Sequence, residues 1–279
     1  MNPEGILHHP TVFHLGPVEI TGFGLSILAA FAIAQIVCQR ELWRRGHDAE
    51  SNAMPDVVMA ALIGTLIGAK TYYVVLTGDP GAFFSRGGFV FWGGFMGAVA
   101  LCWAVIKYRK LSFLRFADVA GIAIAAGYSV GRSGCWAVGD DYGRPWVSAF
   151  AARFPEGAPP STVSVMSSQF GVVFPAGTPG DLVVSVHPTQ LYEVVLGFAM
   201  FSLLWRLRKH THQEGWLFGV WCLLAGAERF IIEFFRAKDD RLTAGLTTAQ
   251  IIAITVFTVG LGVLVARRKG GQGGQATTL

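Results

Sequence analysis

Seven long apolar runs dominate this chain of 279 residues and leave few folds open to it. A helix that crosses a bilayer needs about 20 consecutive apolar residues, and every run is near that length. Hydrophobic residues make up 52% of the chain and charged residues 14%, whereas soluble domains average about 25% charged. We therefore predict an all-α integral membrane protein with seven transmembrane helices. The runs are residues 19–38, 54–76, 88–106, 114–131, 189–206, 215–236 and 247–266.

Clusters of basic residues predict how these helices are oriented. Lysine and arginine accumulate in the cytoplasmic loops that flank membrane helices. Here they follow the first, third, fifth and seventh runs, so basic loops alternate with loops that carry less positive charge. This pattern places the N-terminus outside the cell membrane and the C-terminus in the cytoplasm. The clusters are Arg40, Arg44 and Arg45; Lys107, Arg109, Lys110 and Arg115; Arg206, Arg208 and Lys209; and Arg267, Arg268 and Lys269.

The chain is predicted to form a single transmembrane domain over residues 1–269. Its longest loop, at about 140–187, falls outside and is rich in proline, glycine and serine, so we expect a small cap on the periplasmic side. Short β-type runs at 171–174 and 182–186 are predicted to pair there as a hairpin. The last residues, 270–279, are predicted to be a flexible cytoplasmic tail.

Two small-residue motifs predict that neighbouring helices approach closely. Gly64 and Gly68 lie four residues apart in the second run, and Gly93 and Gly97 lie four apart in the third. Small residues at this spacing allow helix backbones to come near one another in a membrane. Packing accounts fully for these glycines.

The stretch from Gly131 to Arg144 is the first candidate site. Arg132 lies at the end of an apolar run, where a cation is costly unless something pairs with it. Glycines permit tight turns and a close approach of the backbone, so an arginine beside free N–H groups could seat a phosphate. The alternative is a glycine-rich helix end with one arginine reaching to the interface. The glycines are Gly131, Gly134, Gly139 and Gly143.

The second candidate is a charged stripe in the sixth run. Arg229, Glu233 and Arg236 are spaced so that they share one helix face, while the positions between them are bulky and apolar. Charges in hydrocarbon have to point into a bundle or a polar cavity. One carboxylate cannot neutralise two arginines, which favours an anionic ligand over the alternative of a structural ion pair between helices.

The third candidate is the stretch from His187 to Glu193 at the start of the fifth run. Pro188 and Thr189 fit the first positions of a helix, and helix N-termini attract anions. Helix capping alone explains these two residues. It does not explain Gln190 and Glu193, which are polar at a membrane boundary.

Other polar residues are assigned structural roles. Lys70 and Asp118 both lie within apolar runs and are predicted to form an ion pair. His8, His9 and His14 have no carboxylate at ligand spacing, so we expect them at the membrane surface and predict no metal site. The net charge of +4 comes from basic residues beside apolar runs, so it does not indicate a nucleic-acid partner.

Motifs in the same order along most of the chain resemble the prolipoprotein diacylglyceryl transferases of bacterial inner membranes. Several ordered motifs together are specific, and only the loop at about 147–183 has no clear counterpart. The motifs are His9-Pro10, Leu15-Gly16-Pro17, Phe23-Gly24-Leu25, Gly87 to Gly94, Gly131 to Arg144, His187 to Glu193, Arg229 to Arg236, and Gly245-Leu246-Thr247 with Gln250.

The resemblance implies a seven-helix enzyme that transfers a diacylglyceryl group from phosphatidylglycerol to the lipobox cysteine of preprolipoproteins, the first step of lipoprotein maturation. It implies phosphatidylglycerol and secreted signal peptides as partners and no cofactor, and we expect a monomer. The family's phosphate-handling arginines fall on Arg132 and Arg229, with Glu233 as the partner carboxylate. The predicted catalytic residues are His187, Asp140, Arg229 and Glu233, and the predicted phosphate-binding residues are Arg132, Arg229, Arg236, Gly131, Gly134 and Gly143.

The chain departs from the family pattern at five positions. The family usually has histidine at Trp92, asparagine at Cys135 and Val138, glutamate at Asp140 and tyrosine at Phe23. The histidine is often assigned as the base that activates the thiol. Because tryptophan cannot accept a proton, another group must serve as the base here.

The candidates for this base are His187, Asp140, Glu193 and an oxygen of the lipid phosphate. We expect His187, since an unperturbed imidazole pKa of about 6.5 suits proton transfer near neutrality. The alternative is that His187 only orders the junction between the loop and the following helix.

Two further functions stay open at this stage. One is a diverged transferase of the same fold that passes a lipid group to another acceptor. The other is a non-catalytic protein that binds or transports lipid. The departures at Trp92 and Cys135 favour these alternatives, whereas Arg132, Arg229, Glu233 and His187 favour the enzyme.

Overall fold

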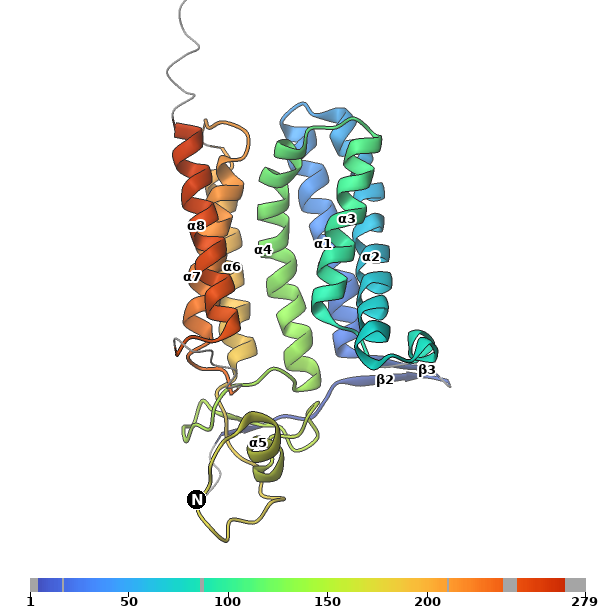
Figure 1. Ribbon diagram of the computed structural model, residues 1–279. Helices are drawn as coiled ribbons and strands as arrows, with labels where there is room; N and C mark the ends of the chain where they lie inside the picture. Colours follow the sequence, from blue (N-terminus) through green and yellow to red (C-terminus); the bar gives the residue numbers. More distant parts are fainter. Residues whose placement is uncertain (1–4, 17, 86–87, 210, 238–244, 269–279) are drawn as a thin grey trace, which may run out of the picture. The chain divides into compact units, whose positions relative to one another are not determined.

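The protein is mainly helical, as the sequence predicts (Figure 1). A computed structural model describes residues 5–16, 18–85, 88–209, 211–237 and 245–268. The predicted tail at 270–279 lies outside these residues. The helices are α1 (Gly22–Arg44), α2 (Asp48–Thr77), η1 (Pro80–Phe84), α3 (Phe91–Tyr108), α4 (Phe113–Val138), α5 (Val163–Phe170), α6 (Thr189–Leu207), α7 (Trp216–Ile232) and α8 (Thr248–Arg268), and the strands are β1 (Ile6–Leu7), β2 (Val12–Leu15), β3 (Val18–Thr21) and β4 (Ala152–Arg153).

Each predicted apolar run lies mostly in a helix. The run at 215–236 leaves its helix after Ile232, so Arg236 does not continue the helical stripe predicted for Arg229, Glu233 and Arg236, because the chain turns there. In the described part of the chain, five helices are long and apolar enough to cross a membrane, namely α1, α2, α4, α6 and α8. The runs at 88–106 and 215–236 correspond to the shorter helices α3, of 18 residues, and α7, of 17 residues. The prediction of an all-α membrane protein is therefore confirmed, and the crossing of α3 and α7 stays a prediction.

The chain divides into two compact units. One contains residues 31–123, and the other contains residues 1–30 together with 124–279. In the first unit, α2 and α3 pack through the predicted glycines. A Cβ atom added at Gly64 would collide with the carbonyl oxygen of Gly97, and one added at Gly68 would collide with that of Gly93. The prediction of close helix approach is therefore confirmed.

Charged side chains of the first unit are paired where they are buried. Glu41 has a fully buried side chain and accepts hydrogen bonds from both Arg44 and Arg45. The predicted ion pair between Lys70 and Asp118 is wrong. Asp118 lies 3.8 Å from Arg45, and Lys70 donates to the carbonyl oxygen of Ser85 at 2.5 Å. Asp118 therefore has a cation from the end of α1 beside it, and Lys70 has a carbonyl oxygen from the segment after η1, and such partners lower the cost of burying a charge.

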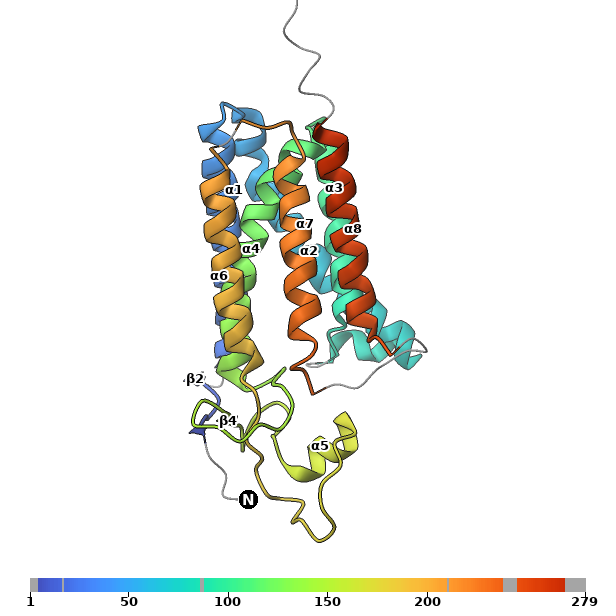
Figure 2. The ribbon, with the colours of Figure 1, turned by 90° about the vertical axis from the view of Figure 1, so that its left-hand side faces the viewer.

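The segment between α4 and α6 forms a small packed layer at the ends of these helices (Figures 1 and 2). Its core contains Phe154, Met166 and Val186, all fully buried, around helix α5. The hairpin predicted for 171–174 and 182–186 does not form. The second run pairs elsewhere, since Val184 donates to Ser161 and Val186 exchanges hydrogen bonds with Ala152. The main-chain groups of Val184 and Val186 are therefore already paired, and Val172 and Phe174 pack against the core through their side chains instead.

The N-terminal strands belong to the same unit. Strands β2 and β3 form an antiparallel hairpin, and β1 pairs in parallel with β4 of the layer beyond α4. The ring of His8 lies edge-on to Trp136 at 4.5 Å between centroids. This ring contact and the β1–β4 pairing join the chain's beginning to the end of α4, and His8 takes part in packing there.

Replacing Gly97 by leucine should disrupt the α2–α3 contact. The new side chain would overlap the backbone of Gly64, and such overpacking costs about 1–3 kcal/mol of unfolding free energy. Thermal unfolding of the detergent-purified protein measures this loss as a lower midpoint. Gly262→Leu in α8 is the matched control, because a Cβ at Gly262 meets nothing within 4 Å. Equal midpoints for the two variants would contradict the packing described here.

Candidate functional site

Two arginines converge on one carboxylate beyond the end of α4. Arg132 Nη1 lies 2.7 Å from Asp141 Oδ2, and Arg236 Nη2 lies 2.7 Å from Asp141 Oδ1. Arg132 comes from the last turns of α4, and Arg236 follows the end of α7. Residues about a hundred positions apart in sequence therefore meet at one anion.

The backbone after α4 positions Asp141 for this contact. Gly139 and Asp141 both adopt left-handed conformations, with φ of 70° and 57°. A left-handed glycine commonly ends a helix, and the Gly139 N–H donates to the carbonyl oxygen of Cys135 at 3.0 Å. The Asp141 carbonyl oxygen accepts hydrogen bonds from Thr189 Oγ1 at 2.7 Å and from Arg236 Nη1 at 3.0 Å. The main chain of Asp141 is thus fixed by two other segments.

Gly143 lies where three segments of the chain meet. A Cβ atom there would collide with the carbonyl oxygen of Phe235 and lie 2.7 Å from the Cβ of His187. The Gly143 N–H donates to the His187 carbonyl oxygen at 2.8 Å. The other two predicted glycines lie against the first turns of α1, since a Cβ at Gly134 would be 2.7 Å from Ser26 Cβ and one at Gly131 would be 4.0 Å from Ile27 Cδ1. These contacts give the glycines a packing role.

A second carboxylate faces Arg132 from within the helices. Arg132 Nη2 lies 3.2 Å from Oε1 of Glu193, which is fully buried in the first turns of α6. The Tyr128 hydroxyl lies 2.9 Å from the same oxygen and 3.1 Å from Glu228 Oε1. A hydroxyl has one hydrogen, so it donates to one carboxylate at a time. Arg132 also lies over the Tyr128 ring, 5.3 Å from its centroid.

Tyr128 and Glu228 were not singled out from the sequence. A signal was present for Glu228, since an acidic residue inside an apolar run marks a polar interior. The sequence analysis assigned the neighbouring Arg229 to the stripe with Glu233 and Arg236 and did not include Glu228. Tyr128 gave no signal, because a tyrosine in a membrane helix commonly serves packing or interfacial anchoring.

Arg229 has a partner of its own. Its Nη2 lies 2.6 Å from Glu233 Oε2, one turn further along, as the spacing predicts. Glu233 is nearly fully buried. In the described part of the chain, Arg229 Nη1 is buried without a hydrogen bond. Arg229 therefore keeps one donor that could bind an anion, although Arg132 and Arg236 rather than Arg229 share the carboxylate of Asp141.

The two aspartates after α4 differ in pKa. Burial and the neighbouring Asp141 raise the pKa of Asp140 to about 6. Burial alone would also raise the pKa of Asp141, but Arg236 and Arg132 outweigh it and hold that pKa well below the usual range. Asp140 Oδ1 is buried with no hydrogen-bond partner among the described residues. Asp140 is thus able to exchange a proton near neutral pH, whereas Asp141 stays ionised.

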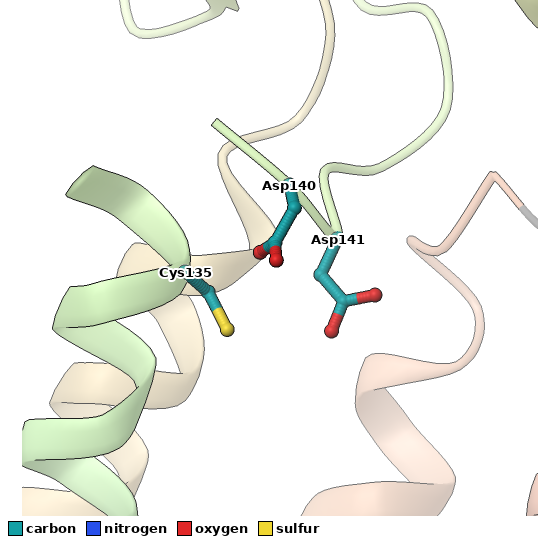
Figure 3. Close-up of side chains that lie close together, drawn as sticks. All are labelled: Cys135, Asp140 and Asp141. Atoms are coloured by element: carbon teal, nitrogen blue, oxygen red, sulfur yellow. The ribbon is translucent and has the colours of Figure 1, made fainter. Parts of the chain in front are cut away.

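Three possible ligand atoms gather around these aspartates (Figure 3). The Cys135 Sγ and one oxygen each of Asp140 and Asp141 lie within 4.8 Å of one another. Both oxygens of Asp141 are already ion-paired, and Arg132 Nη1 is 3.7 Å from the Cys135 sulfur. A cation placed here would lie beside a guanidinium group, so the cluster is accounted for by its ion pairs.

His187 lies in an aromatic setting just before α6. Its ring stacks on Trp146 with centroids 4.4 Å apart and planes at 7°, and the ring of Phe235 lies edge-on at 5.3 Å. Its Nδ1 is 3.2 Å from the hydroxyl of Tyr192. Burial lowers the pKa of His187, so the ring is neutral at pH 7 and can accept a proton. Trp92 belongs to the other unit, where it is 44% exposed.

Comparison with known proteins connects this chain to a family. The family model described as prolipoprotein diacylglyceryl transferase matches residues 10–266. Proteins named phosphatidylglycerol–prolipoprotein diacylglyceryl transferase are similar over nearly the whole chain. The relative from Geobacter sulfurreducens is 30% identical over 94% of this chain and 97% of its own. That from Lysinibacillus sphaericus is 30% identical over 93% and 92%. That from Xanthomonas oryzae pv. oryzae is 28% identical over 93% and 91%. The chain belongs to the prolipoprotein diacylglyceryl transferase family.

Proposed function

We propose that this protein transfers the diacylglyceryl group of phosphatidylglycerol to the lipobox cysteine of preprolipoproteins, the first step of lipoprotein maturation. The family match supports the reaction class, and the names of the relatives supply the two substrates. The observation that carries the proposal is the set of three arginines at the ends of α4 and α7. Cations at a membrane boundary suit the phosphate of an anionic lipid. The arginines are Arg132, Arg229 and Arg236.

The reaction makes a defined demand on these residues. The thiol sulfur bonds to the glyceryl carbon that bears the phosphate, the carbon–oxygen bond to the phosphate breaks, and glycerol 1-phosphate leaves. Negative charge grows on the leaving phosphate, so arginines at that position lower the barrier. The buried, unbonded Nη1 of Arg229 is a donor available for this, with Glu233 holding its other nitrogen.

The thiol proton needs an acceptor, and we assign this role to His187. The ring is neutral near pH 7, and its orientation is fixed by stacking on Trp146 and by the Tyr192 hydroxyl. Asp140 is the second candidate, because its raised pKa of about 6 also suits proton transfer. The family histidine position is Trp92 in this chain, and an indole ring cannot accept the proton.

We also propose the membrane arrangement that the basic clusters indicate. All seven apolar helices cross the inner membrane as a single domain and a monomer, with the N-terminus and the layer around α5 on the periplasmic side. The basic clusters after α1, α3, α6 and α8 support this orientation. The base, the arginines and the incoming signal peptide would then all lie at the outer leaflet.

Expression of this protein should restore growth and lipoprotein lipidation in a bacterium depleted of its own transferase. Mass spectrometry of a reporter lipoprotein should show the diacylglyceryl thioether on the lipobox cysteine. Arg229→Gln should abolish rescue, because it removes the free donor and leaves Glu233 unpaired. Membrane-inserted wild-type protein that binds phosphatidylglycerol without forming the thioether would refute transfer and favour the non-catalytic alternative, which the departures at Trp92 and Cys135 motivate.

The change His187→Gln should lower kcat by roughly a hundredfold or more while leaving lipid binding intact, which is the usual scale of losing a general base. Glutamine preserves hydrogen bonding to Tyr192 but cannot take the proton. The pH profile of kcat/KM for the wild type should lose activity below the lowered pKa of His187, and the variant should lack that limb. A well-folded His187→Gln variant with near-normal turnover would exclude the base assignment, and Asp140→Asn would be tested next.

A membrane-impermeant thiol reagent should label a cysteine placed at Ser167 in intact cells but not one placed at Ser112. Ser167 is exposed on α5, and Ser112 directly precedes α4 at the end joined to the basic loop after α3. The unmodified protein is the background control: Cys38, Cys135 and Cys222 are buried, and any labelling of the half-buried Cys102 is measured in it. Labelling in the opposite sense would overturn the proposed orientation.

A further inference from the structure

The Asp141 carboxylate lies between two arginines, in the position that an anionic ligand would take. We propose that it is an internal anion that occupies the phosphate seat, and that a lipid phosphate diester or the phosphate monoester product exchanges with it at Arg132 and Arg236. This rests on the proposed function for the identity of the lipid, but not for the exchange itself.

The geometry of the contact matches what a phosphate would make. One oxygen of Asp141 is 2.7 Å from Arg132 Nη1, and the other is 2.7 Å from Arg236 Nη2. Guanidinium groups bind carboxylate and phosphate oxygens through the same charge-assisted hydrogen bonds. A phosphate with two free oxygens can therefore replace the carboxylate without moving either arginine.

The exposed fractions of the three side chains indicate that Asp141, rather than either arginine, can move. The side chain of Asp141 is 39% exposed, whereas those of Arg132 and Arg236 are 19% and 13% exposed. The Asp141 carbonyl oxygen is held by Thr189 and by Arg236 Nη1, so the main chain can stay in place. Rotation about the Cα–Cβ bond would then carry the carboxylate into water while the arginines keep their positions.

The charges around Asp141 explain why the two arginines need an anionic partner and why that partner weakens phosphate binding. Arg132 and Arg236 are mostly buried, and a buried guanidinium without a partner is strongly unfavourable. Arg132 already faces Glu193 at 3.2 Å, so with Asp141 in place the two arginines meet two carboxylates. The group then has no net charge to offer a phosphate. When Asp141 leaves, one positive charge becomes available.

The proposal predicts that removing the carboxylate strengthens phosphate binding. Asp141→Asn should bind phosphatidylglycerol about tenfold or more tightly, since the ligand no longer competes with a charged hydrogen-bonded group. Binding is measured by calorimetry on the detergent-purified full chain, with phosphatidylglycerol and, separately, glycerol 1-phosphate. Tighter binding of the lipid alone assigns the seat to the substrate diester, and tighter binding of glycerol 1-phosphate alone assigns it to the leaving product.

Asp181→Asn is the matched control, because Asp181 is exposed in the layer beyond α4 and the variant carries the same change in net charge. Its affinities should equal those of the wild type. Asp141→Glu restores a carboxylate and should return the affinity toward the wild-type value. Unchanged or weaker binding of both ligands by Asp141→Asn would overturn the proposal, because the carboxylate would then be organising the arginines for the phosphate.

Folding is part of the same test. Asp141→Ser provides a second variant without the carboxylate, and at least one of the two should accumulate as folded protein. Failure of both to fold would show that Asp141 is a structural ion-pair partner and would also overturn the proposal. Binding is scored without thioether formation, so a protein that shows the exchange but transfers nothing would refute the proposed function and leave the exchange in place.

Discussion

Arg132 is held between two carboxylates, Glu193 of α6 and Asp141 of the turn after α4, and this contact organises the part of its unit around the end of α4. A guanidinium at the end of an apolar helix cannot be buried without partners. Its two partners come from separate segments, and Asp141 brings in Arg236 as a third. Helices α4 and α6 and the segment after α7 are therefore joined by charge at one place. Each of these charged groups can be buried only because the others are present to pair with it.

The sequence predicted the helices well and their polar partners less well. Apolar runs of spanning length gave every long helix, since hydrophobicity over such a window leaves no other stable structure in a bilayer. The spacing of Gly64 and Gly68 and of Gly93 and Gly97 predicted a close helix approach, and the structure adds that Gly64 lies against Gly97. The pair of Arg229 and Glu233 also followed, because both lie on one helix face. These features depend on the spacing of residues within one helix, which can be read directly from the sequence.

The sequence did not predict which side chains from distant segments pair with one another. Lys70 and Asp118 were matched because both lie in apolar runs, yet Asp118 lies beside Arg45 and Lys70 donates to Ser85. Asp141 was passed over because an aspartate in a glycine-rich loop is ordinarily a turn residue. Its role as the carboxylate shared by two arginines depends on Arg236, which is distant in sequence but lies beside it in the fold. Tyr128 also could not be found this way, because its hydroxyl matters only once Glu193 and Glu228 lie beside it.

The backbone around Gly143 has a consequence for how this family can vary. Gly143 donates to His187, His187 donates to Arg144, and Arg144 donates to Phe235, all through main-chain groups. These hydrogen bonds do not depend on which side chains the donors carry, apart from the missing Cβ at Gly143. These main-chain hydrogen bonds therefore hold His187 in place whatever side chain stands at Cys135. Substitutions at Cys135 can change the reactivity of the site over evolution without a new fold being required.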